Sequence, residues 1–214
     1  MNYLELVNDV LVRLRESEVT SVSDNSYSKL IGKFINDSKR QVEDAYNWNA
    51  LTETLTAATD VAIFSYAMTG IGTRFKVIDV IDDTNNVKLE YAPTSDMNKW
   101  FLTVYASGTP RYYNFNGVDS NGDTMVDMYP VPNGVYNVRF NVIIPQNNLT
   151  ANADELLVPS EPVILGAYAR ALAERGEDGG LASSEAYQLY KSSLADYIAI
   201  ESGRYLEEVV WRAE

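Results

Sequence analysis

The sequence predicts an α+β protein: a four-helix bundle formed by N- and C-terminal helix pairs, with an inserted antiparallel β-module. Near both ends of the chain, apolar residues recur at three- and four-residue spacing, the period of an amphipathic helix. Between these regions, residues that favour strands alternate with turn-forming clusters. We therefore expect residues 1–51 and 156–202 to form the bundle, residues 52–155 the module, and residues 203–214 a C-terminal tail.

The N-terminal pair is predicted from two apolar stripes. The first stripe consists of Leu4, Val7, Leu11 and Leu14. The second consists of Tyr27, Leu30, Ile31, Phe34, Ile35 and Val42. Asp24, Asn25 and Ser26 are each able to cap the second helix, which is expected to end near Tyr46 and to pair with the first as a hairpin. The basic pair Lys39–Arg40 is interpreted as part of a solvated helix face.

The C-terminal pair begins after "LVPSEP". Ser160 is able to cap the third helix, and Pro162 falls in its first turn, where the missing N–H is harmless. The inner stripe consists of Ile164, Tyr168, Ala171 and Leu172. Glycines in "RGEDGG" end this helix, and the fourth helix carries Tyr187, Tyr190, Leu194, Tyr197 and Ile198 on one face.

The clearest strand of the module is predicted over residues 135–144. Its inward side chains are Tyr136, Val138, Phe140, Val142 and Ile144, because successive side chains of a strand alternate between faces. We expect it to form a hairpin with "TMVDMY" through a turn at residues 132–134, with "PRYYNFN" as a third strand. "SDMNKWFLTVY" is compatible with either a short helix or a strand.

Composition excludes several kinds of chemistry. The chain has no Cys and no His, so Ser-His-Asp and Cys-His catalysis and the usual zinc ligands are excluded. We expect no enzyme activity, no cofactor and no metal. The net charge of -13 predicts repulsion from a phosphate backbone, and suits a surface past which DNA slides. The N-terminus lacks a signal peptide and no window is apolar enough for a bilayer, so we expect no membrane contact and a cytoplasm-like compartment.

Three motifs have an alternative, simpler interpretation. "DSNGDTMVD" from Asp119 resembles a calcium loop, but Thr124 stands where the turn glycine belongs, which favours a polar hairpin loop. "ERGEDGG" brings Glu174, Glu177 and Asp178 together, but an exposed helix end explains them. "TGIGTRF" lacks the following helix and lysine of a phosphate loop, so a turn is predicted.

Two groups of residues are candidates for protein contacts. Tyr112, Tyr113, Tyr129 and Tyr136 lie in and around the module, and tyrosine suits interfaces as well as half-buried strands. The tail "RYLEEVVWRAE" carries Tyr205, Leu206, Val209, Val210 and Trp211 beyond a bundle that is already complete. These apolar residues need a partner surface, either on their own bundle or on a neighbouring protein.

Several stretches resemble the head-to-tail adaptor proteins of tailed bacteriophages, also called head-completion or tail tubular A proteins. The stretches are "YLELVNDVLVRLRE", "FINDSKRQVEDAYNWNAL", "SGTPRYYNFNG", "DMYPVPNGVYNVRFNVIIP", "LVPSEPVILGAYARALAERGED" and "AYQLYKSSLADYI". The resemblance covers nearly the whole chain. It implies a structural virion protein of the neck or tail, assembled in the host cytoplasm.

The resemblance also implies partners. Such proteins form a homo-oligomeric ring, a dodecamer on the portal, which extends the DNA channel toward tail or nozzle proteins. The tail with Tyr205 and Trp211 is then the portal anchor, and the module around "YPVPNGVY" faces a neighbouring subunit or a tail protein. DNA passes through the lumen without specific binding. The alternatives are another tail or baseplate component with a receptor- or sugar-facing module, and an Asp/Glu-dependent hydrolase, for which no carboxylate pair stands out.

Overall fold

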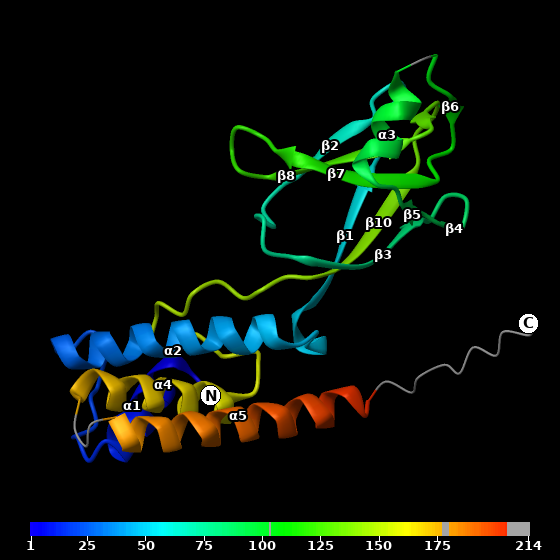
Figure 1. The fold of residues 1–214 in the computed structure, drawn as a ribbon. Coiled ribbons are helices and arrows are strands. Elements are labelled where there is room, and N and C mark those ends of the chain that lie inside the picture. Colours follow the sequence, from blue (N-terminus) through cyan, green and yellow to red (C-terminus); the bar gives the residue numbers. More distant parts are fainter. Residues whose placement is uncertain (103, 177–179, 205–214) are drawn as a thin grey trace, which may run out of the picture. The chain divides into compact units, whose positions relative to one another are not determined.

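The computed structural model describes residues 1–102, 104–176 and 180–204. The chain divides into two compact units. The helical unit consists of Met1–Leu51 and the chain from Gln146 onward, and the β unit consists of Thr52–Pro145. In the described residues there are five α-helices and ten strands in three sheets (Figure 1).

The helical unit contains α1 (Tyr3–Arg13), α2 (Ser26–Ala45), α4 (Ser160–Arg175), α5 (Leu181–Ser202) and a short 3-10 turn (Asn49–Leu51). Capping boxes begin α1 and α2: Asn2 with Glu5, and Asn25 with Ser28. Gly176, in the left-handed conformation at φ 66°, ends α4. Asn25 is therefore the cap among the three candidates, whereas the predicted cap Ser160 is wrong, since it is the first helical residue and Pro159 precedes it without a side-chain cap.

Helix α4 is the centre of the helical unit, because it packs against α1, α2 and α5 (Figure 1). Gly166 lets the helices approach closely here: a Cβ on it would lie 3.0 Å from Oγ of Ser38 on α2 and 3.2 Å from the Tyr190 ring on α5. The buried apolar side chains of these helices include Leu6, Val10, Ile31, Ile35, Val42, Val163, Ile164, Ala167, Tyr190 and Leu194.

The β unit contains ten strands and α3 (Thr94–Phe101). The strands are β1 (Thr52–Ala58), β2 (Ser65–Met68), β3 (Lys76–Asp82), β4 (Val87–Lys88), β5 (Glu90–Tyr91), β6 (Ser107–Gly108), β7 (Tyr112–Val118), β8 (Thr124–Tyr129), β9 (Val131–Pro132) and β10 (Asn137–Ile143). One sheet has the order β1-β10-β3-β4, a second has the order β2-β8-β7-β5, and β6 pairs with β9.

The two larger sheets share one apolar core. It consists of Met68, Ile71, Val80, Leu89, Tyr113, Val126, Met128, Val138, Phe140 and Val142. At one side the chain passes directly from β4 in the first sheet to β5 in the second through buried Leu89, whose N–H donates to Val80 of β3 (2.8 Å). Strands β1 and β2 are the opposite edges of the two sheets.

The predicted fold class is wrong. The helices do not form a four-helix bundle of two pairs, because α4 contacts each of the other three. The β unit is not a purely antiparallel module: it has its own core and a helix, and it includes the parallel pairs β5–β7 and β6–β9. Helical periodicity predicts which face of a helix is buried, but says little about which helix covers it.

The predicted hairpin between "TMVDMY" and residues 135–144 is also wrong. β8 pairs with β2 and β7, whereas β10 pairs with β1 and β3 in the other sheet. The intervening residues include β9, which pairs with β6, so the chain crosses between sheets there. The predicted alternation along β10 is confirmed for Val138, Phe140 and Val142, which are buried, but it fails at the end of the strand, where Ile143 is buried and Ile144 is half-buried.

Candidate interaction surfaces

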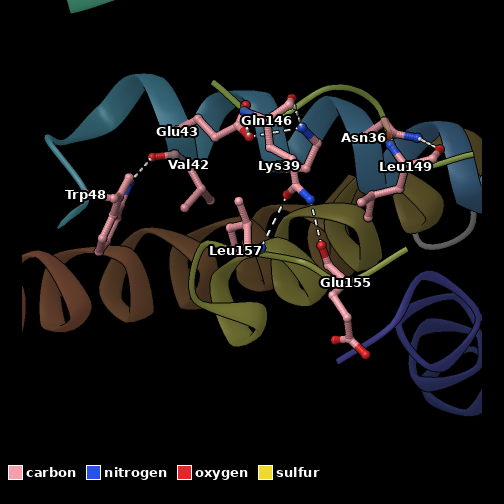
Figure 2. Close-up of polar contacts among 9 residues, drawn as sticks. All are labelled: Asn36, Lys39, Val42, Glu43, Trp48, Gln146, Leu149, Glu155 and Leu157. Atoms are coloured by element: carbon pink, nitrogen blue, oxygen red, sulfur yellow. Dashed lines mark hydrogen bonds and ion pairs between the residues drawn. The ribbon is translucent and has the colours of Figure 1, made fainter. Parts of the chain in front are cut away.

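A buried polar network attaches the chain leaving the β unit to α2 (Figure 2). The Nζ of Lys39 lies 2.9 Å from Oε1 of Glu43 and donates to the carbonyl of Gln146 (2.6 Å), and both charged side chains are 1% exposed. The same Glu43 oxygen accepts the Gln146 N–H (3.1 Å). The prediction that Lys39 lies on a solvated face is therefore wrong, although its neighbour Arg40 is exposed.

Two amides extend this network along residues 146–157. The Asn36 side chain donates to the carbonyl of Leu149 (3.0 Å) and accepts its N–H (2.8 Å), as one strand would with another (Figure 2). The Gln146 side chain donates to Glu155 O and accepts from Leu157 N. Paired polar contacts as well as the apolar core thus hold the segment that begins at Gln146 to the N-terminal segment of the helical unit.

The β unit carries an aromatic cluster built around Trp100 of α3. Tyr112 and Tyr129, directly opposite each other on β7 and β8, place their ring centroids 4.9 Å from that of Trp100. Phe101 packs edge-on against Tyr129 (5.6 Å) and also contacts Phe64 (4.7 Å). Contacts between aromatic rings stabilise a fold both by burying apolar surface and by the favourable edge-to-face and offset-stacked geometry of the rings.

The structure brings two of the four predicted tyrosines together and separates the others. Tyr112 and Tyr129 are half-buried in the aromatic cluster. Tyr113 points to the opposite face of β7 and lies in the core beside Tyr91 and Phe115, where burial raises the pKa of its phenol. Tyr136 lies in the turn before β10, where its hydroxyl bonds the Asn133 side chain.

Exposed apolar side chains follow α3 directly. Leu102, Val104 and Tyr105, here called the apolar trio, are 81%, 98% and 52% exposed. The trio leads into Ala106, whose N–H donates to the Tyr129 hydroxyl (3.3 Å) and whose carbonyl accepts from Val131 (2.9 Å). The sequence did not single out these residues, because the period of "SDMNKWFLTVY" fits neither a helix nor a strand throughout.

The edge strands β1 and β2 border an apolar opening in the β unit. This opening has a volume of about 280 Å³ and is lined by Leu55, Ala57, Tyr66, Met68, Val126, Met128 and Phe140, among others. Leu55 and Ala57 lie directly opposite Phe140 and Val138 of β10, so they face the same side of the sheet as those core residues.

In the helical unit a groove of about 400 Å³ lies at the end of α5. Its lining includes Trp48, Leu157, Tyr197, Ile200 and Arg204. The predicted anchor residues Tyr205, Leu206, Val209, Val210 and Trp211 lie outside the described residues.

The calcium-like motif is a hairpin turn between β7 and β8. Oδ1 of Asp119 accepts the N–H groups of Asn121 (2.8 Å) and Asp123 (2.9 Å), and backbone bonds of this kind, from Asp123 first, hold the pKa of the Asp119 carboxyl below its usual value. Gly70 and Gly72 of "TGIGTRF" both have positive φ, as in a turn. Glu177 and Asp178 lie outside the described residues, whereas Glu174 is exposed near the end of α4.

The described residues offer surfaces for protein contacts. In residues 1–102, 104–176 and 180–204 no three acidic, His or Cys residues gather in a way that could hold a metal ion. Over the same part of the chain, no helix has the length and apolar character that would let it cross a membrane. Exposed apolar side chains, an aromatic cluster and an open sheet edge together are typical of structural proteins that act through contacts.

The family model described as SU10 adaptor protein matches residues 1–211 of the chain. The protein therefore belongs to the SU10 adaptor family, which is a family of phage head-to-tail adaptors. Membership makes it a structural phage protein of the virion neck that interacts with portal and tail proteins. Among curated proteins, no match to the chain is found.

Proposed function

We propose that the protein forms a ring between portal and tail and extends the DNA channel. The family match over residues 1–211 is the observation that carries this proposal. The ring is a dodecamer on the portal, assembled in the host cytoplasm, and the protein catalyses no reaction. DNA passes through the lumen without specific binding, which the net charge of -13 supports because phosphate contacts need clustered Lys and Arg.

The contacts of the ring are assigned to two regions. Residues 205–214 dock onto the portal through Tyr205, Leu206, Val209, Val210 and Trp211, since an aromatic anchor on a short segment is an effective docking device. In the β unit, Tyr112, Tyr129 and Tyr136 contribute to the face toward a neighbouring subunit or a tail protein, and Tyr113 supports β7 from the core.

Electron microscopy of the protein mixed with the portal encoded nearest its gene tests this proposal. We expect a new ring on the tail-side face of the portal. A copy ending at Arg204 should remain folded but give no ring, because the docking residues are removed. A double substitution within the tail, Tyr205→Ala with Trp211→Ala, should weaken binding with the chain length unchanged.

The controls separate the tail from the rest of the protein. Val12→Ala removes an exposed apolar side chain of α1 that does not line the groove at the end of α5, and it should leave ring formation intact. A bare portal beside folded full-length protein contradicts the adaptor ring. A ring that still forms after truncation at Arg204 supports the adaptor ring and contradicts the docking role of residues 205–214.

A further inference from the structure

The β unit is closed on one side and open on the other. On the closed side, edge strands β4 and β5 have two residues each, and buried Leu89 joins them. On the open side, β1 has seven residues, six of them exposed, and in the described residues it pairs with β10 alone. A long edge strand carries a row of backbone N–H and C=O groups that are available to another strand.

The register of β1 with β10 shows which backbone groups of β1 are available. The N–H of Thr59, directly after β1, donates to the carbonyl of Tyr136 (2.9 Å). Because hydrogen-bonded pairs alternate along an antiparallel ladder, the odd-numbered residues of β1 bond β10 in the same way. The even-numbered residues therefore direct their N–H and C=O groups to the free edge. These residues are Thr52, Thr54, Thr56 and Ala58.

The sequence of β1 does little to protect this edge. Natural sheets blunt their edges with Lys, Pro, bulges or a covering segment. β1 reads Thr-Glu-Thr-Leu-Thr-Ala-Ala, so it contains no Lys or Pro and its one charge is Glu53. Its pairing with β10 runs without a register shift from Thr52 to Ala58, so no bulge turns the edge away. The edge is therefore open to another strand.

The free edge of β1 is complementary to itself in the antiparallel direction. In the register that uses all four residues with outward groups, Thr54 pairs with Thr56 of a second copy, and Thr52 pairs with Ala58. Each pair then exchanges backbone hydrogen bonds across the edge. The facing threonine side chains lie on the outer side of the sheet, where such cross-strand pairs are favourable.

The remaining side chains of β1 also suit this register. Leu55 faces its own counterpart, and Glu53 faces Ala57, so the single charge of the strand meets no like charge. These three side chains lie on the core-facing side of the sheet, because their partners on β10 are buried. The second copy therefore adds its Leu55 at the edge of the apolar opening between β1 and β2, which Leu55 of the first copy already lines.

We propose that two free copies of the protein pair through β1, edge to edge and antiparallel, so that their two four-stranded sheets become one continuous sheet. A two-fold axis passes between the facing Leu55 residues. Copies in a ring around a single axis share one orientation, so a two-fold contact is not a contact within that ring. The proposal concerns the free protein and goes beyond the proposed function, on which it does not depend.

The size of the contact determines when it forms. Two seven-residue strands bury far less surface than the roughly 1,600 Å² of a standard stable interface. The dimer is therefore expected to be weak, present in concentrated protein and separated by dilution.

Cysteine pairs test the register of the two strands, since the chain has no Cys. Full-length Glu53→Cys and Ala57→Cys proteins are mixed at high concentration and oxidised. In the proposed register these positions are directly opposite, with Cβ atoms about 4.5–5.5 Å apart. Two copies of the same position lie four residues apart along the strands, about 13 Å. We expect the mixture to give at least about tenfold more disulfide-linked dimer than either variant alone, because only facing positions are within disulfide reach.

Two further proteins test the geometry. The double variant Glu53→Cys/Ala57→Cys should form closed dimers with two disulfides, and a ladder of three or more copies would overturn the two-fold arrangement. Val87→Cys in place of Ala57→Cys is the matched control, since Val87 is exposed on the closed-side strand β4. Equal yields with Val87→Cys and Ala57→Cys contradict the proposal, as does the absence of disulfide-linked dimer from the first mixture.

Sedimentation of proteins without cysteine measures the same contact reversibly. The unaltered protein should be partly dimeric when concentrated and monomeric after dilution. Thr54→Pro removes an outward N–H, and proline is tolerated at such a position of an edge strand, so this variant should stay folded and monomeric. Ala57→Glu places like charges opposite each other twice in the dimer and should weaken it about fivefold.

The results also separate this contact from the adaptor ring. Folded Thr54→Pro and Ala57→Glu proteins that dimerise as the unaltered protein does would assign the dimer to another surface and overturn the proposal. A ring on the portal from protein that gives no mixed disulfide leaves the adaptor function standing and this contact wrong. Mixed disulfides from protein that forms no ring on the portal support the contact and contradict the function.

Discussion

At residue scale, removal of one partner of the buried Lys39–Glu43 ion pair is expected to destabilise the helical unit strongly. Lys39→Met removes the positive charge and the bond to the Gln146 carbonyl, leaving a carboxylate in a site that is 1% exposed. Breaking a buried pair in this way costs about 3–5 kcal/mol. Urea unfolding monitored by helical circular dichroism measures the loss.

Two further variants show whether the cost comes from the unpaired charge. The double variant Lys39→Met/Glu43→Leu should recover part of the stability, because no charge then remains buried at the site. Arg13→Met breaks an exposed pair with Asp9 and should change the free energy of unfolding by less than about 1 kcal/mol. If Lys39→Met were as mild as Arg13→Met, the network would not hold residues 146–157 to α2.

Gly32 of α2 is expected to be required for its lack of a side chain. A Cβ at this position would lie 2.3 Å from the Tyr3 hydroxyl and 2.9 Å from Cγ1 of Val22, both closer than real contacts allow. Gly32→Ala should therefore lower the free energy of unfolding, because overpacking costs about 1–3 kcal/mol. Alanine gains only roughly 1 kcal/mol over glycine in a helix, so overpacking outweighs this gain. Thermal unfolding measures the balance, and a stabilised variant contradicts it.

Gly203→Ala is the matched control for Gly32→Ala. Its added Cβ would meet the Ala199 carbonyl at 3.4 Å and the Ile200 carbonyl at 3.6 Å, which are ordinary contacts, and its φ is -68°. We expect a change of less than about 0.5 kcal/mol at this position.

Sequence patterns predicted the burial and contacts of single polar residues least accurately. Lys39 was assigned to a solvated face because lysine is almost never fully buried, yet Glu43 one turn later and the Gln146 carbonyl compensate its burial. The carbonyl comes from a residue more than a hundred positions away, which no local pattern could show. Tyr112 and Tyr129 were candidates from composition, whereas Trp100, which joins them, was not.

At the scale of elements, the open edge of β1 is expected to accept a charged side chain without unfolding the protein. Ala57→Lys places a charge in the apolar opening at an exposed position, the device that natural edge strands use. We expect a loss of stability below about 1 kcal/mol, since a lysine head can reach water there. Urea unfolding measures the change.

Val87→Lys on the closed side is the control for this element. Its strand has two residues and already carries Lys88, so the substitution should leave the stability unchanged. A loss well above about 1 kcal/mol from Ala57→Lys, but not from Val87→Lys, would show that the edge of β1 does not accept a charge.

The helices and strands and their buried faces were predicted more accurately than the pairing between strands. Period-two alternation correctly gave the buried face of β10, and helical spacing gave the core residues Ile31, Ile35 and Val42 of α2. The same patterns joined β8 and β10 as a hairpin, because closeness in sequence with a turn between them is the usual sign of one. Pairing of β10 with β1 depends on contacts between residues as distant in sequence as Thr52 and Ile143, which periodicity does not encode.

At the scale of the whole molecule, the β unit is expected to fold on its own. Thr52 pairs with Ile143, two residues before the end of the unit at Pro145, so the Cα atoms of this pair lie about 5 Å apart and the two ends are close together. Each unit has its own buried side chains, and the core of the β unit lies entirely within residues 52–145. Residues 52–145 expressed alone should give a dispersed proton NMR spectrum and cooperative unfolding.

The complementary protein tests the same division from the other side. Replacing residues 52–145 by a short glycine-serine linker joins Leu51 to Gln146 across the gap that β1 and β10 span. Because Lys39, Glu43 and Asn36 hold residues 146–149 through contacts inside the helical unit, this protein should keep its helical circular dichroism. It should also bind portals through residues 205–214, because the proposed docking residues are retained. Unfolding of the linked protein would show instead that the helical unit needs the β unit to form.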